Sequence, residues 1–480
     1  MKFKNFIPWI ILAIILGGLV AWYFLSKRVT NEQIVTYQQI IGEARESLEA
    51  KEYSTAMNKY YEAVDVIPSR VEAYDGIVEI LLEKNRINDA LDIVNKSTRK
   101  VGGYDRSMLY QKIGDKYLEN GEYDNALSIY LDGVLLTLNN PSLELSLGKV
   151  YLKKGNVNKA KSQFEKNIYS EDTLYEAILL RSYIYGISNI EDAKDILEST
   201  TPSDIWKPFF DEYSEVLDSL NEDIKYNATK LSKVYINNDF PYLAIEMLEP
   251  IADEILEYLE GMYFLGRSYM EYGDYDSAIE YLDRALTLGG MEEDILWSKA
   301  RAYLGKNELE NAISCYSSAI DYAGKNASED MVSEYLDLLI ENNQTIKAST
   351  VVQKLIAYIS SAYIRIYGVK INSLLNDTKK VDYYLGLLSK MKLSDEVKKE
   401  YLYLYAKRDL EKGNIDEAKK NLDAIALIDT FYPYYYYLYG KIEISLGNTD
   451  NAKDLLKKAI EYDMNNLVSD EASRLLSDMD

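Results

Sequence analysis

The side chains in this sequence that are best suited to binding chemistry are four pairs of an aromatic and a cationic residue. The two members of each pair are four positions apart, so they share one face of a helix. An aromatic ring can pack against apolar groups while a neighbouring cation binds a carboxylate. The alternative, that each pair only supports its own helix, stays open. The predicted partner-binding residues are Tyr263 with Arg267, Trp297 with Arg301, Tyr403 with Lys407, and Tyr437 with Lys441.

Catalytic chemistry is poorly supplied. The chain has no histidine, which excludes Ser/His/Asp and Cys/His arrangements. Cys315 is the single cysteine, so no intrachain disulfide and no thiolate metal cluster can form. With 78 aspartates and glutamates, paired carboxylates occur by chance and carry no signal. Glycine-rich nucleotide-binding motifs are absent from the sequence. We therefore predict a protein that is not an enzyme, with no cofactor and no metal site.

The net charge of the chain is −24. An acidic excess of this size repels the phosphate backbone of nucleic acids, so we do not expect a nucleic-acid partner. The same charge helps to keep a long protein soluble.

The amino-terminal segment is apolar. Residues 6–25 carry no charge, and twenty residues span about 30 Å as a helix. The rival interpretation is a cleavable signal peptide, whose apolar core is usually shorter, about 7–15 residues. We predict a short basic terminus over 1–5, a transmembrane anchor over 6–25 and a linker over 26–36. Lysines before the anchor slightly favour a single-pass membrane protein whose repeat domain lies outside the cytoplasm.

A pattern of small residues recurs every 34 residues. In one unit Gly266 lies twelve positions before Ala278, and the same frame returns around Ala312, 34 residues later. Near Asp382, where another unit belongs, no small residue is found. The clearest marker residues are Ala126, Ala160, Ala278, Ala312 and Ala452, and weaker markers in the same register are Ala56, Ala90, Ala193, Ala244, Ala348 and Ala418.

Each unit has the pattern of two helices joined by a turn. Leu265 and Tyr269 have helical spacing, Gly273 breaks the chain, and Ala278 and Leu282 continue in a second helix. The units resemble the tetratricopeptide repeat family, whose 34-residue helical hairpins stack into a right-handed superhelix. The resemblance implies an all-α, right-handed superhelical solenoid of about twelve hairpins, here preceded by the predicted transmembrane helix. The family favours an aromatic residue at the positions of Tyr117, Tyr151, Tyr235, Tyr269 and Tyr303, so we expect these rings to pack.

The array is interrupted once. Ala193 and Ala244 are 51 residues apart, which is one and a half repeats and indicates an inserted helix. Its apolar face favours a rigid elbow over a hinge. The predicted domains are an N-terminal array over 37–200, an inserted helix or elbow over 201–223, a C-terminal array over 224–463 and a capping helix over 464–480.

The resemblance implies a scaffold that binds protein or peptide partners in a concave groove lined by the first helix of each hairpin. Because the four aromatic–cation pairs belong on those first helices, we expect partners with acidic segments. The predicted function is a membrane-anchored, non-catalytic scaffold. The alternative is a protein of the cell envelope that binds carbohydrate or assists polysaccharide assembly, with aromatic rings stacking on sugars.

Overall fold

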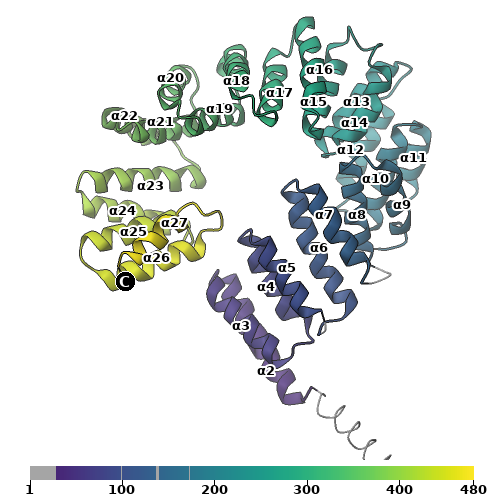
Figure 1. The fold of residues 1–480 in the computed structure, drawn as a ribbon. Helices are drawn as coiled ribbons and strands as arrows, with labels where there is room; N and C mark the ends of the chain where they lie inside the picture. Colours follow the sequence, from purple (N-terminus) through teal and green to yellow (C-terminus); the bar gives the residue numbers. More distant parts are fainter. Residues whose placement is uncertain (1–28, 99, 137–139, 172, 480) are drawn as a thin grey trace, which may run out of the picture. The chain divides into compact units, whose positions relative to one another are not determined.

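The structure is a computed structural model that describes residues 29–98, 100–136, 140–171 and 173–479. These residues form twenty-six α-helices, α2–α27, and no strand occurs among them (Figure 1). Apart from α12 and α27, consecutive helices pair into twelve hairpins, from α2–α3 to α25–α26. The prediction of an all-α chain is confirmed, while the right-handed course of the superhelix stays a prediction.

The chain divides into two compact units, one ending at Ile113 and one beginning at Gly114, with the division inside α6. The first unit contains α2 (Asn31–Glu49), α3 (Tyr53–Val66), α4 (Val71–Glu83), α5 (Ile87–Ser97) and the first part of α6 (Gly103–Glu119). The second unit continues through α7 (Tyr123–Val134), α8 (Pro141–Lys153), α9 (Val157–Asn167), α10 (Leu174–Gly186), α11 (Ile190–Glu198), α12 (Lys207–Asp218), α13 (Ile224–Asn237), α14 (Pro241–Leu248), α15 (Leu259–Tyr272), α16 (Tyr275–Leu288), α17 (Glu292–Gly305), α18 (Leu309–Ala323), α19 (Glu329–Glu341), α20 (Thr345–Leu355), α21 (Ala362–Leu374), α22 (Thr378–Leu388), α23 (Asp395–Glu411), α24 (Ile415–Ala426), α25 (Pro433–Ser445), α26 (Thr449–Tyr462) and α27 (Ser469–Ser477).

The hairpin α15–α16 shows how the repeat pattern produces the turn. Gly273 ends α15 with a φ of 97°, a left-handed conformation that glycine adopts without steric cost. The side chain of Asp274 then caps α16 by accepting a hydrogen bond from the backbone N–H of Ser277, at 3.2 Å. The marker Ala278 is fully buried. The turn and the small residue predicted from the sequence therefore have direct structural roles.

Close approach of the two helices depends on a small residue in the first helix. A Cβ added to Gly266 would lie 2.7 Å from the side chain of Leu282, sixteen positions further on. Because real Cβ atoms do not come this close to a neighbour, only glycine fits without a shift. The same sixteen-residue contact recurs at Gly114 with Tyr130, Gly148 with Phe164, Gly368 with Tyr384 and Gly440 with Leu456.

The hairpin α21–α22 departs from the strict register. Val381, not residue 382, takes the buried place of the marker alanine, because the connection before α22 is one residue shorter. Asp382 is exposed and binds Arg408 at 2.9 Å and Lys412 at 2.9 Å. Hydrogen bonds from Arg408 are the main cause that lowers the pKa of Asp382 to about 2.

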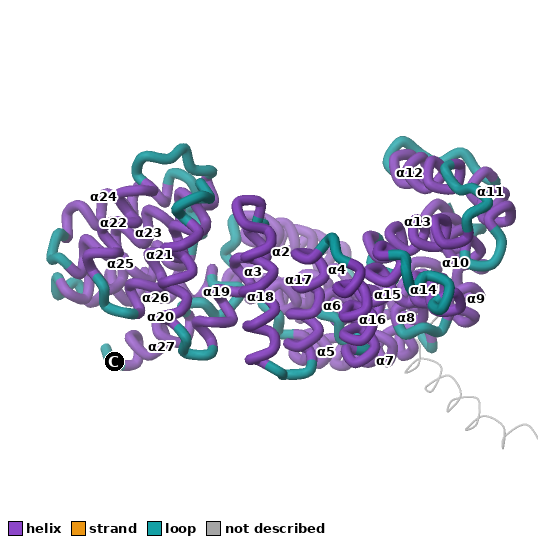
Figure 2. The backbone as a smooth tube through the Cα atoms, turned by 90° about the horizontal axis from the view of Figure 1, so that it is seen from above, coloured by secondary structure: helices purple, strands orange, loops and turns teal. Residues whose placement is uncertain are grey.

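The inserted helix α12 lies within the range 201–223 and packs beside α11 and α13 (Figure 2). Its buried Tyr213 ring meets the ring of Tyr183 on α10 edge-on, with 4.6 Å between the centroids. Tyr235 on α13 donates a hydrogen bond from its hydroxyl to the backbone carbonyl of Tyr183, at 3.0 Å. These contacts favour a rigid elbow, and the division of the array at this point stays a prediction. At the carboxyl end, α27 packs on α26 within the range 464–480.

The predicted membrane placement requires correction. No helix in the described part of the chain is both long and apolar enough to cross a bilayer. The longest, α2, has 19 residues and carries charges such as Glu43 and Arg45, which a bilayer core disfavours. The segments 1–5 and 6–25 lie outside the described residues, and α2 begins inside the predicted linker 26–36. The finding overturns the prediction of a single-pass membrane protein with an extracytoplasmic repeat domain.

Candidate functional site

The first predicted pair, on α15, is engaged within its own hairpin. Tyr263 is buried, with only 6% of its surface exposed. Arg267 forms an ion pair with Glu271 one turn further along the same helix, with 2.8 Å between Nε and Oε1. Burial raises the pKa of the Tyr263 hydroxyl. This pair therefore stabilises its helix and offers little open surface.

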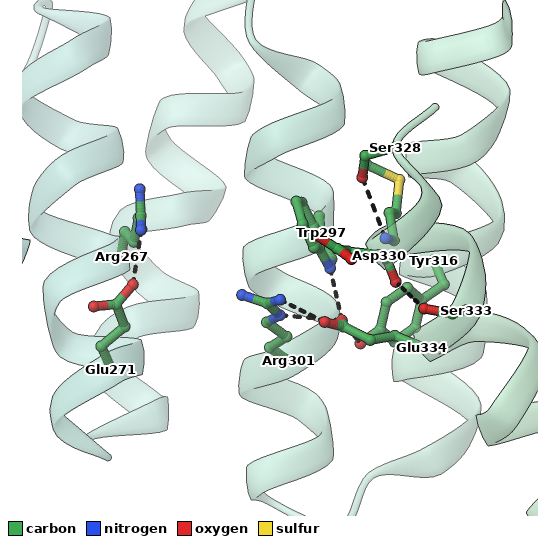
Figure 3. A network of polar contacts seen from close by, with 10 residues as sticks. Arg267, Glu271, Trp297, Arg301, Tyr316, Ser328, Asp330, Ser333 and Glu334 are labelled. Carbon is green, nitrogen blue, oxygen red and sulfur yellow. Dashed lines mark hydrogen bonds and ion pairs between the residues drawn. The ribbon is translucent and has the colours of Figure 1, made fainter. Parts of the chain in front are cut away.

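The second pair, on α17, belongs to a network that joins three helices (Figure 3). Trp297 donates from its indole Nε1 to Glu334 on α19 at 2.7 Å, and Arg301 donates from Nε to the same carboxylate at 3.1 Å. Tyr316 on α18 donates a third hydrogen bond from its hydroxyl, at 2.8 Å. The Arg301 guanidinium also lies over the Trp297 ring, 4.3 Å from its centroid. We call Trp297, Arg301, Tyr316 and Glu334 the Glu334 network.

The electrostatics of this network favour an ionised carboxylate. Burial acts to raise the pKa of Glu334, but the hydrogen bonds from Arg301, Trp297 and Tyr316 outweigh it and leave the pKa lowered. Burial and the neighbouring carboxylate raise the pKa of the Tyr316 hydroxyl, which keeps it protonated as a donor. The cation that the sequence assigns to a partner is thus already bound by a carboxylate of the next hairpin.

We expect Glu334→Gln to destabilise the α17–α19 region by about 1–2 kcal/mol at pH 7, because it removes the charge and keeps the shape. The native pKa of Glu334 is lowered, so its contribution is present above the unfolded value of 4.5 and is lost as pH falls through the native pKa. The difference between wild type and variant should therefore shrink in acid. Hydrogen exchange of α17–α19 at neutral and acidic pH measures this. A difference that persists unchanged in acid would assign the effect to packing.

The third and fourth pairs, on α23 and α25, keep their cations exposed. Lys407 is exposed, and it has no ion pair among the described residues. Lys441 is also exposed and lies over the Tyr437 ring, 5.3 Å from its centroid. Tyr437 is buried and donates its hydroxyl to Glu471, while Tyr403 is half-buried. These two lysines are the most accessible cations of the four pairs.

Further tyrosines join the third and fourth pairs. The ring of Tyr403 lies 4.8 Å from that of Tyr434 and 6.5 Å from that of Tyr432, centroid to centroid. Tyr432 and Tyr434 are themselves 5.5 Å apart. Because all three rings are half-buried, they present edges to solvent as well as packing on one another. The surface formed by Tyr403, Lys407, Tyr434, Tyr437 and Lys441 is called the α23–α25 surface below.

The aromatic–cation pattern is interrupted between these two regions. A hollow of 420 Å³ lies between α19 and α21, lined among others by Asp330, Tyr363, Tyr367 and Glu400. Tyr367 donates its hydroxyl to Asp337 at 2.8 Å. This part of the first-helix face is therefore acidic and aromatic, opposite in charge to the predicted pairs.

Sequence reasoning missed Glu334, because nothing in its own repeat marks it. A signal was available: Glu334 lies 33 residues after Arg301, so stacking of neighbouring hairpins brings the two together. The search for a metal site among the described residues finds no cluster of three or more histidine, cysteine, aspartate or glutamate side chains. Cys315 is buried, and burial raises the pKa of its thiol.

Consecutive antiparallel helix pairs that repeat the same small-residue contact define a helical-repeat protein. Models of one family, described as the tetratricopeptide repeat, match residues 263–328 and 433–466. The first match runs from within α15 past the end of α18, and the second covers α25 and α26. The chain therefore contains tetratricopeptide repeats, as the resemblance implies.

A curated relative carries the same repeats. The TPR repeat-containing protein MJ1428 of Methanocaldococcus jannaschii is 22% identical over 291 residues, 56% of this chain and 47% of that protein. The chain thus spans about half the length of this relative.

Three solved structures are similar to this chain. The APC/C hetero-tetramer Cut9–Hcn1 contains a chain 14% identical, covering 92% of this chain and 96% of that one, with a TM-score of 0.35. Naa15/Naa10 bound to HypK gives 12%, 92%, 96% and 0.37, and yeast Tom70 gives 13%, 78%, 95% and 0.32. These TM-scores are too low to establish a shared overall arrangement.

Proposed function

We propose that this chain is a non-catalytic scaffold that binds protein or peptide partners on the faces formed by the first helices of its hairpins. The tetratricopeptide repeats support the class, because proteins built from such repeats bind protein partners. The observation that carries the proposal is the α23–α25 surface, where two exposed lysines lie beside half-buried and buried tyrosine rings.

An acidic segment with apolar residues fits the α23–α25 surface best. Lys407 and Lys441 occupy equivalent positions in adjacent hairpins, 34 residues apart, and α23 packs against α25. Carboxylates of a partner would bind the two ammonium groups, and its apolar side chains would contact the ring edges of Tyr403 and Tyr434. On α15 and α17 the cations already bind Glu271 and Glu334, so a partner there would have to displace a carboxylate.

We expect the double substitution Lys407→Glu/Lys441→Glu to weaken binding of an acidic, leucine-containing peptide by about tenfold or more. The matched control is Lys420→Glu/Lys457→Glu, which makes the same charge change at exposed positions of the second helices α24 and α26. Fluorescence anisotropy on the full chain measures both affinities. Equal weakening by the two double variants would reduce the effect to net charge and contradict a specific surface.

A further inference from the structure

A second candidate surface lies in the amino-terminal unit. It is a hollow of 510 Å³ between α2, α3, α4 and the first part of α6. Apolar side chains at its lining include Leu48, Val71, Met108 and Leu109. Met108 is 45% exposed, which is unusual for a large apolar residue unless something covers it. The sequence shows only a mixed set of residues on this face and does not predict the hollow.

A glycine shapes the floor of this hollow. Gly76 on α4 lies directly against the ring of Tyr60 on α3, and a Cβ built there would be 2.2 Å from the ring. The Tyr60 ring is therefore pressed onto the backbone of α4, and it is 97% buried because only 3% of its surface is exposed. Since the ring cannot move without displacing a helix, the floor is preformed.

The rim of the hollow is strongly acidic. Five lining carboxylates face two lining cations, and four of the carboxylates lie in one stripe along α4. A stripe from the first to the last of these covers about 16 Å, at 1.5 Å per residue. The stripe consists of Glu72, Asp75, Glu79 and Glu83, and the lining cations are Arg45 and Lys51.

The four carboxylates of the stripe differ in their partners. Asp75 forms an ion pair with Lys112 at 2.5 Å. Glu72 accepts a hydrogen bond from Tyr37 at 3.4 Å and lies 3.6 Å from Arg70. Glu79 and Glu83 are exposed and form no ion pair with any residue in the described part of the chain. One end of the stripe thus leaves two carboxylates, one helical turn apart, facing solvent beside an apolar floor.

We propose that this hollow binds a basic amphipathic helix of a protein partner. Lysine or arginine residues four positions apart on such a helix match the spacing of Glu79 and Glu83. Apolar residues on the adjoining face of the helix would cover Leu48 and Met108. The partner differs in charge from the one proposed for the α23–α25 surface, and the site lies in the other unit. The inference therefore stands independently of the proposed function.

The probe is a synthetic amphipathic peptide of leucine and lysine, about 18 residues long so that a helix can form. A peptide with glutamate in place of lysine is the control. We expect the full chain to bind the lysine peptide and not the glutamate peptide, with affinity falling as salt rises from low to moderate concentration. Absence of binding to the lysine peptide would overturn the proposal.

Two double variants locate the site. Glu79→Lys/Glu83→Lys should weaken binding about tenfold or more. Asp65→Lys/Asp92→Lys makes the same charge change at exposed positions of α3 and α5 outside the hollow and should leave the affinity within about twofold. Equal weakening by both pairs would show attraction to net charge alone and overturn the site. Circular dichroism checks that each variant keeps its helix content.

The apolar floor is tested separately. Met108→Ser should weaken peptide binding about threefold or more while leaving its salt dependence unchanged, because only apolar contact is lost. An unchanged affinity would mean that the peptide does not cover the floor, which would overturn docking in the hollow.

Discussion

Replacing Tyr213 with alanine is expected to destabilise the junction around α12 by about 3–5 kcal/mol, the usual cost of removing a buried aromatic ring. Tyr213 is 1% exposed, and its ring packs edge-on against Tyr183 of α10. Its hydroxyl lies 3.5 Å from the backbone carbonyl of Ser182, which it approaches as a donor. Removal of the ring would leave a cavity where the inserted helix contacts its neighbours.

Two further variants separate the ring from its hydroxyl and from its helix. Tyr213→Phe keeps the ring and should cost about 0.5–1.5 kcal/mol, the net value of a hydrogen bond. Phe209→Ala, on the same helix but 48% exposed, should cost less than Tyr213→Ala because less surface is buried there. Since stability in a repeat array is local, hydrogen exchange of α10–α13 is the appropriate measurement. Similar losses for Tyr213→Ala and Phe209→Ala would contradict a rigid elbow.

The repeat architecture could be predicted because small residues report directly on helix contacts. Ala126, Ala278 and Ala452 are fully buried, as their 34-residue frame indicates. The prediction that conserved-frame tyrosines pack is confirmed at Tyr235 and Tyr269, which are both buried. A frame of this kind needs no knowledge of distant contacts, since each hairpin packs mainly on its neighbours.

The register failed where the chain changed its spacing. A strict 34-residue period points to Asp382, but Val381 occupies the buried position because α22 begins one residue earlier. A period read from small residues cannot detect this, because valine is not small and a buried valine looks like any other apolar residue in sequence.

The candidate site was only partly predictable. The i, i+4 spacing correctly places Trp297 and Arg301 side by side on α17, where the guanidinium stacks on the indole. Their partner Glu334 comes from the next hairpin, and the sequence gives no reason to choose it over 77 other carboxylates. Burial of Tyr263 likewise depends on how neighbouring hairpins pack. Membership of a helix face follows from spacing, whereas accessibility depends on tertiary contacts.

The last prediction uses one chemical change, glycine to alanine, at two helical positions where opposite effects are expected. Gly266→Ala should destabilise the hairpin α15–α16 by about 1–3 kcal/mol through overpacking. The added methyl group would lie 2.7 Å from the side chain and 3.0 Å from the backbone nitrogen of Leu282. Because a backbone atom is among the close neighbours, rotation of the leucine side chain cannot relieve the contact, and the two helices must separate.

Gly386→Ala should instead stabilise α22, by about 0.5–1 kcal/mol, because alanine loses less backbone entropy than glycine in a helix. Gly386 is exposed, and a Cβ there would meet no atom within 4 Å. Hydrogen exchange of α15–α16 and of α22 in the two variants gives the sign of each effect, and Gly266→Phe should exceed Gly266→Ala. If Gly266→Ala also stabilised its hairpin, helix propensity would outweigh packing there, and the sixteen-residue glycine contact would not be what determines the spacing of the two helices.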